Sequence, residues 1–279
     1  MEIVGRSAEL GGVGIERFLP KAQLRTVGPW CFVDRMSNVA DPNLGAMEVA
    51  PHPHFGLATV TFLLEGSVEH SDSIGNRINI KPGQINIMTA GAGVSHSEVS
   101  TSGSALAGVQ LWAALPSERY LGATAFEHVP AAYFYESREF SAEIISGEFL
   151  GEMQDIGLSH SALGVVVTSR TNNFDISLNP SYQHIFVPLY GDYSIYEVIA
   201  PKAVFVAGKT KAKFVGATGS KFLILGGLPF EEKILMWWNF VGRSWEEIIE
   251  ARRQWNENDG RFGSFASQYD RIVAPPILR

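Results

Sequence analysis

The chain has 279 residues, of which 46% are hydrophobic and 18% charged, a composition typical of a globular protein with an ample core. Its formal net charge of −7 argues against the basic surface that nucleic-acid binding through phosphate contacts requires. The single cysteine, Cys31, excludes an internal disulfide and favours a reducing compartment.

The amino-terminal residues lack a basic segment followed by an apolar stretch, and they lack a small-residue cleavage pattern. No apolar run approaches the length of a membrane span. We therefore expect a cytoplasmic protein without direct contact to membrane or nucleic acid. Any role at DNA would have to come through a partner protein.

Short strands are expected from residue 50 to about 115. Runs rich in Val, Ile, Thr and Phe alternate there with glycine and proline turns such as Lys81-Pro82-Gly83. This pattern predicts an antiparallel sandwich or barrel. Residues 116–160 are less regular and are interpreted as a connector with outer strands.

A second strand-rich region repeats the first. The segment FLLEG at 62–66 has the counterpart VPLYG at 187–191, which is an offset of 125 residues. The same offset relates two further pairs of turn glycines: Gly83 with Gly208, and Gly91 with Gly216. Matching turns in matching order predict two copies of one β-barrel unit.

The carboxy-terminal segment is expected to be helical. Ser244 and Glu247 have capping-box spacing, and an apolar stripe follows them, so the sequence predicts a helix at about 244–257 on the outside of a barrel. We place the first domain, with the metal site, at 1–125. The second domain, at 126–279, includes this helix.

Two polar pairs suggest a metal site in the first domain. His52 and His54 are separated by one residue, and His96 and Glu98 repeat that spacing. In a strand, residues i and i+2 point to the same face, so neighbouring strands would bring three imidazoles and one carboxylate together. Such a set suits a divalent transition metal, with two positions of an octahedral ion left open.

The alternative for His52 and His54 is a pair of ordinary imidazoles at a strand edge, since Pro53 lies between them. The matching pair at His96 and Glu98 favours the metal. The 125-residue offset takes the four candidates to residues that are not ligands in this pattern: Ser177, Asn179, Lys221 and Leu223. The second unit is therefore expected to be structural or regulatory.

The remaining histidines lack a matched pair. His70 is expected to face outward, with a place near the barrel interior as the alternative. His128, His160 and His184 are expected to be structural or exposed.

The sequence resembles the pirin family of metal-binding bicupins. The resemblance rests on HPHFGLATVTFLLEG, HSDSIGN, KPGQINIMTAG and GVSHSE, in family order and spacing, with VGPWCFVDRM upstream. It implies an all-β bicupin, with two tandem antiparallel β-barrel domains of the double-stranded β-helix type and a terminal helix. It also implies an iron site held by His52, His54, His96 and Glu98, with Fe(II) the expected metal. The ligands alone leave Mn, Ni and Cu open.

Some pirins cleave quercetin with dioxygen, so the resemblance implies a quercetin 2,3-dioxygenase-type oxidoreductase acting on a flavonol or a similar enolisable aromatic. Glu98 is then the candidate catalytic base for the 3-hydroxyl proton. The alternative is a non-enzymatic, iron-dependent redox sensor that binds a transcription factor or metabolic enzyme. A third interpretation is a cupin with a structural metal that binds an unknown metabolite.

Three positions depart from the family pattern and bear on the substrate. Ala92 replaces a common arginine, Arg35 replaces a common histidine, and Phe55 stands where Arg or Ile is usual. We expect Arg35 to restore a cation near the barrel mouth. The residues expected to line an apolar pocket are Phe55, Phe62, Met88 and Trp112.

Overall fold

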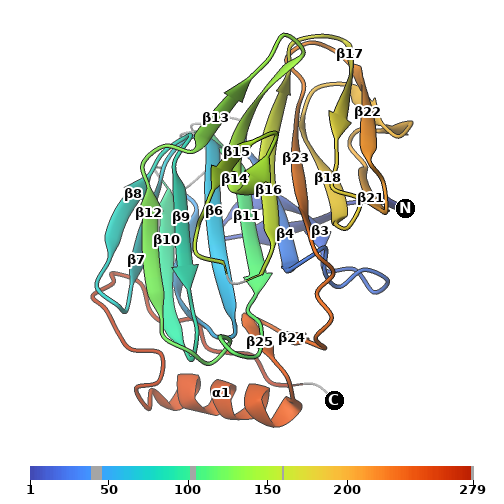
Figure 1. The fold of residues 1–279 in the computed structure, drawn as a ribbon. Coiled ribbons are helices and arrows are strands. Elements are labelled where there is room, and N and C mark those ends of the chain that lie inside the picture. Colours follow the sequence, from blue (N-terminus) through green and yellow to red (C-terminus); the bar gives the residue numbers. More distant parts are fainter. Residues whose placement is uncertain (39–45, 101–104, 159, 278–279) are drawn as a thin grey trace.

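Two β units lie side by side in a computed structural model that describes residues 1–38, 46–100, 105–158 and 160–277 (Figure 1). Each unit pairs a large antiparallel sheet with a four-stranded one. The mostly β architecture agrees with the expected fold class. Among the described residues, no helix is both long and apolar enough to cross a membrane.

The first unit contains the residues of the expected metal site. Its seven-stranded sheet has the order β12-β9-β6-β11-β4-β3-β2 and its smaller sheet the order β5-β10-β7-β8. The large sheet consists of β2 (Arg6–Leu10), β3 (Val13–Leu19), β4 (Trp30–Asn38), β6 (Leu57–Glu65), β9 (Ile85–Thr89), β11 (Leu106–Ala114) and β12 (Ala125–Val129). The small sheet consists of β5 (Glu48–His54), β7 (Val68–Asp72), β8 (Arg77–Ile80) and β10 (Val94–Ser100).

The second unit has the same plan. Its large sheet has the order β1-β21-β18-β23-β16-β14-β13, with β15 added beside β14, and its small sheet the order β17-β22-β19-β20. The large sheet consists of β1 (Glu2–Ile3), β13 (Tyr133–Glu136), β14 (Phe140–Phe149), β15 (Glu152–Gln154), β16 (Ala162–Ser169), β18 (Gln183–Tyr190), β21 (Ala203–Ala207) and β23 (Lys221–Gly227). The small sheet consists of β17 (Asn173–Ser177), β19 (Tyr193–Ile195), β20 (Val198–Ile199) and β22 (Lys211–Gly216).

The repeat is present, but its offset is not constant. Strand β7 begins at Val68 and β19 at Tyr193, which agrees with 125, whereas β10 begins at Val94 and β22 already at Lys211. The turns between these strands are shorter in the second unit. The expected counterparts of His96 and Glu98 are therefore wrong, because Lys221 and Leu223 lie on β23, and the matching strand is β22. The glycine pairs beyond β7 do not correspond either.

The largest apolar cluster lies between the two large sheets. On β6, Val60 and Phe62 belong to this cluster, and Val187 on β18 faces them from the second unit. Because side chains alternate along a strand, Thr61 on β6 points the other way, into the first unit. Phe62 therefore cannot line the metal site, contrary to expectation, and instead joins the two units.

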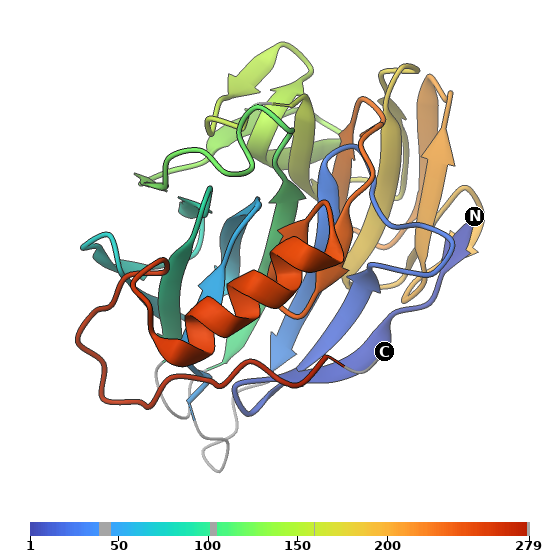
Figure 2. The same cartoon turned by 90° about the horizontal axis from the view of Figure 1, so that it is seen from below.

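The helix α1 (Trp245–Glu257) confirms the expected terminal helix. The Ser244 hydroxyl accepts a hydrogen bond from the backbone amide of Glu247, which satisfies a free donor of the first turn. Figure 2 shows α1 crossing the end of the first unit, where Ile248 and Trp255 are buried against Phe55.

The two ends of the chain cross between the units. Strand β1 pairs with β21 of the second unit. The carboxy-terminal segment, including β24 (Leu235–Trp237) and β25 (Phe240–Gly242), packs on the first unit, where the Ile272 amide donates to the Pro51 carbonyl at 2.9 Å. Strand β12 pairs with β9, so the chain leaves the first sheet after Val129, slightly beyond the expected boundary at 125.

Candidate metal centre

Three neighbouring strands of the small sheet position the candidate ligands. Strand β10 lies between β5 and β7, with His96 directly opposite His52 on one side and Asp72 on the other. Glu98 lies opposite His70. Cross-strand partners share a face of the sheet, so the register directs all of these side chains into the first unit.

The structure brings the three predicted histidines together. The ligand nitrogens of His52, His54 and His96 lie within 4.8 Å of one another. Glu98 falls in an overlapping group, with His70 and His96, that meets the same distance limit. The four predicted residues line one cavity, and His96 is the member common to both groups.

Hydrogen bonds at Nδ1, the outer ring nitrogen that points away from the cluster, orient two of the imidazoles. His52 Nδ1 lies 2.9 Å from the Ala50 carbonyl oxygen, and His54 Nδ1 lies 3.1 Å from that of Asn239. Because a carbonyl only accepts, each Nδ1 carries the proton and each Nε2 keeps its lone pair. This arrangement is typical of metal-binding histidines.

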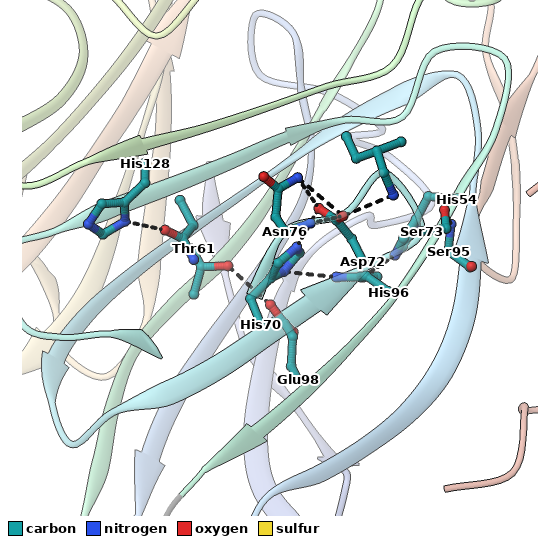
Figure 3. Close-up of polar contacts among 12 residues, drawn as sticks. His54, Thr61, His70, Asp72, Ser73, Asn76, Ser95, His96, Glu98 and His128 are labelled. Carbon is teal, nitrogen blue, oxygen red and sulfur yellow. Dashed lines mark hydrogen bonds and ion pairs between the residues drawn. The ribbon is translucent and has the colours of Figure 1, made fainter. Parts of the chain in front are cut away.

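A chain of contacts fixes the third imidazole in the same way (Figure 3). The Asp72 carboxylate accepts from the Asn76 side chain and from His70 Nε2 at 3.1 Å. In the neutral tautomer of His70, Nδ1 then has a lone pair, and it faces His96 Nδ1 at 3.3 Å. His96 consequently donates from Nδ1 and keeps the lone pair on Nε2.

His70 is the functional residue that sequence reasoning misplaced. It is 3% exposed and packs on Phe126 at a ring separation of 4.7 Å, so the expected outward position is wrong. The signal was present, because His70 and Asp72 have the same i, i+2 spacing as the two ligand pairs. Val68 at the start of β7 is buried on the same face.

Burial sets the ionisation of the cluster. It lowers the pKa of His52 to about 4, and it holds the pKa values of His54 and His96 well below the ordinary value. Burial raises the pKa of Glu98. For Asp72, burial opposes ionisation, but hydrogen bonds from His70 and Asn76 outweigh it and lower the pKa. The imidazoles are therefore neutral, as metal ligands must be.

The donor set fits a metal cation. His54 Nε2 and His96 Nε2 lie 3.1 Å apart. With both protons on the outer nitrogens, this contact joins two lone pairs, which repel each other unless a cation lies between them. Three neutral imidazoles and one carboxylate suit a divalent transition metal.

The cavity beside the cluster has a volume of about 300 Å³. Phe32 and Trp112 stack along its wall with ring centroids 4.0 Å apart, and Trp112 also contacts the edge of His54. Of the four expected lining residues, only Trp112 is among those that line this cavity. Phe55 packs on Phe240 under α1 instead.

The charged residues near the site differ from expectation. Arg35 contacts Glu16 and the Pro188 carbonyl between the units, so it does not restore a cation at the mouth. Arg261 from the carboxy-terminal segment does reach position 92, where it donates to the Ala92 carbonyl at 2.8 Å. Its guanidinium lies 4.7 Å from the Phe55 ring centroid.

The carboxy-terminal segment supplies part of the cavity wall. Trp238, Asn239 and Ile272 line the cavity although they are far from the ligands in sequence. No local pattern in this segment indicates such a role, because its apolar residues serve packing on α1 as well.

Comparison with known families agrees with this geometry. The Pirin family model matches residues 12–113, and the model of the Pirin C-terminal cupin domain matches residues 166–263. The chain belongs to the pirin family. Its two units are therefore cupins, and the fold is the bicupin that the sequence predicted.

Relatives of this pirin include proteins named for dioxygenase activity. A Pseudomonas aeruginosa protein provisionally named a quercetin 2,3-dioxygenase is 35% identical over 99% of this chain and 90% of its own length. The crystal structure of an Acinetobacter baumannii quercetin 2,3-dioxygenase is also 35% identical, covers 100% of this chain and 95% of that one, and superposes with a TM-score of 0.94.

A more distant neighbour shares the fold. It is an Escherichia coli pirin crystallised with nickel(II), 18% identical over 81% of this chain and 95% of that one, with a TM-score of 0.63. The histidine and glutamate cluster together with the pirin fold supports a bound metal in this chain.

Proposed function

We propose that this pirin is a metal-dependent dioxygenase of the quercetin 2,3-dioxygenase type, acting on a flavonol or a similar enolisable aromatic. The observation that carries the proposal is the set of three imidazole Nε2 lone pairs and the Glu98 carboxylate on one aromatic-walled cavity. The names of relatives that are 35% identical over nearly the whole chain support the same chemistry.

The proposed ligands are His52, His54, His96 and Glu98, and the proposed metal is Fe(II). Manganese, nickel and copper accept the same ligands, and the nickel in the distant neighbour makes nickel a candidate to test. When bound, the metal would hold the deprotonated flavonol oxygen and act as a Lewis acid beside dioxygen.

Glu98 is the proposed catalytic base. It is buried at the cavity, and the Thr61 hydroxyl lies 3.3 Å from its Oε1. Thr61 also contacts Gln110 Oε1 at 2.9 Å, and its single hydroxyl proton goes to one of these two oxygens at a time. The other oxygen of the Glu98 carboxylate can accept the 3-hydroxyl proton. Phe32 and Trp112 line the cavity as an aromatic wall against which the substrate could pack.

Anaerobic loading with iron, followed by quercetin and dioxygen, tests the proposal. We expect carbon monoxide and loss of the flavonol absorbance. Parallel loading with manganese, nickel and copper identifies the productive metal. If the protein is fully loaded with each of the four metals in turn and none of them gives product, the dioxygenase proposal for quercetin is overturned.

Glu98→Gln tests the base at nearly constant shape. A general base contributes roughly 10²- to 10⁴-fold to rate, so we expect turnover per bound metal ion to fall in that range. Metal content is measured on the same sample, because Glu98 is also a proposed ligand. Thr61→Val, which leaves the carboxylate but removes its hydroxyl partner, is the matched control and should have a smaller effect. Unchanged turnover in Glu98→Gln would contradict the assignment of Glu98 as the catalytic base.

A second candidate function is a redox-dependent regulator. Its support is the contact of His54 with the Asn239 carbonyl, because this contact connects a proposed ligand directly to the carboxy-terminal segment. A change of metal charge would then alter that segment. Hydrogen exchange of residues 235–277 in the Fe(II) and Fe(III) states measures the effect, and identical exchange would refute it.

A further inference from the structure

A second cavity of about 400 Å³ adjoins the metal cavity. The two cavities share four wall residues, namely Arg17, Phe32, Trp112 and Trp238. A ligand that passes along the wall formed by Phe32 and Trp112 therefore has space at both ends. We refer to the two spaces as the inner cavity, which contains the ligands, and the outer cavity.

The outer cavity is basic although the chain carries a net charge of −7. Its walls include Arg6, Arg17 and Lys21, and no carboxylate is among its lining residues in the part of the chain that the structure describes. Asp34 neutralises Arg17 through two contacts of 2.7 Å. Glu16, whose charge also acts on Lys21, is paired with Arg35, so the charges of Arg6 and Lys21 remain for a ligand.

Arg6 and Lys21 lie close enough to act on each other. Arg6 on β2 lies directly opposite Arg17 on β3, whose charge Asp34 offsets. Burial and the nearby charge of Arg6 both lower the pKa of Lys21. Lys21 Nζ donates to the Val4 carbonyl at 2.6 Å, which leaves further N–H donors for an anion.

We propose that the outer cavity binds an anionic substituent, such as a sulfonate, sulfate or carboxylate, of an aromatic substrate whose enolic end occupies the inner cavity. This inference rests on the proposed function for the identity of the aromatic part. Arg6 and Lys21 bind the anion, and Phe32 and Trp112 form the aromatic wall along which the middle of the ligand lies between the two ends. The substrate class is thus an acidic flavonol-like compound.

Binding without dioxygen tests the proposal apart from turnover. Isothermal titration calorimetry of the metal-loaded protein under argon compares quercetin with quercetin-5′-sulfonate. Two cation contacts at a partly exposed site correspond to roughly tenfold tighter binding of the sulfonate. This preference should disappear in about 0.5 M salt, because exposed charges are screened there. Equal affinities at low salt would overturn the proposal.

Variants locate the effect. Arg6→Gln with Lys21→Gln should abolish the preference for the sulfonate while quercetin affinity stays within about twofold. Lys209→Gln with Lys213→Gln removes the same charge from exposed positions of the second unit and should leave the preference intact. If the preference for the sulfonate survives in the Arg6 and Lys21 double variant, or if both double variants lose it equally, the outer cavity is not the anion site. Absence of carbon monoxide would refute the proposed function and leave this binding result standing.

Discussion

The two cupins of the chain share strand order, but the inner face of the small sheet has polar side chains in the first unit and aromatic side chains in the second. In the first unit, β5 and β10 direct His52, His96 and Glu98 inward. In the second unit, the matching strands β17 and β22 direct Phe174 and Phe214 inward, with ring centroids 4.6 Å apart. Among the described residues, the groups that could hold a metal lie in the first unit, and the corresponding face of the second unit is apolar.

The two units also differ in how their buried side chains are stabilised. Buried imidazoles and carboxylates cost free energy unless each polar atom has a partner, and the first unit supplies these partners through Asp72, Thr61 and backbone carbonyls. The second unit contains an apolar cluster that stabilises the fold through burial alone. The inner face of the small sheet is therefore polar and hydrogen-bonded in the first unit and apolar in the second.

Removing the shared ligand is expected to have the largest effect. His96 belongs to both groups of ligand atoms, so His96→Gln should abolish metal binding at stoichiometric levels. Elemental analysis of the purified variant measures this. In the second unit, Phe214→Leu is the opposite test, because it should cost about 1 kcal/mol of stability and leave metal content unchanged. Full metal content in His96→Gln would contradict the site.

His184 in the second unit gives a pH-dependent effect. Its ring is fully buried without a hydrogen-bond partner among the described residues, and burial lowers its pKa to about 4 from the ordinary 6.5. Between these values the unfolded chain binds the proton and the folded chain does not. Stability is therefore complete above pH 6.5 and declines by up to about 3 kcal/mol as pH falls to 4.

Denaturant unfolding of the metal-free protein at several pH values measures this decline. His184→Leu should flatten the curve relative to the wild type, and the difference between the two curves isolates His184 from the ligand histidines. Parallel curves for the two proteins would show that His184 is not protonated on unfolding in this range.

The smallest expected effect is that of changing Asp72, which contacts His70 and through it His96. Asp72→Asn weakens the contact that fixes His70 and, through it, His96, so metal affinity should fall between about tenfold and a hundredfold. Competition with a chelator measures the affinity. Asp175→Asn, an exposed position on β17, is the matched control in the second unit and should change nothing. Equal affinities of wild type and Asp72→Asn would remove His70 from the site.

A feature of the fold or site could be predicted from the sequence when the residues that form it are close together in the chain. The ligands follow from i, i+2 spacing within single strands, and the helix follows from its cap at Ser244. Phe62 and His70 were misplaced because a single strand does not reveal which of its faces meets which sheet. Asn239 was missed because its contact with His54 spans 185 residues.

The repeat shows a related limit. A fixed offset assumes equal turn lengths, and it held only as far as β7 and β19 before the shorter turns of the second unit displaced it. On β22 itself, the residues that face inward, Ala212 and Phe214, are apolar.

The crossing of the two chain ends makes the units inseparable. Glu2 and Ile3 complete a sheet edge in the second unit, while Trp238 and Ile272 close the cavity of the first. A single cut in the linker at 130–132 would leave two fragments, each holding a piece that belongs to the other. The bicupin behaves in this respect like a domain-swapped pair within one polypeptide, and the wall of the cavity at the candidate metal centre is complete only when both halves have folded together.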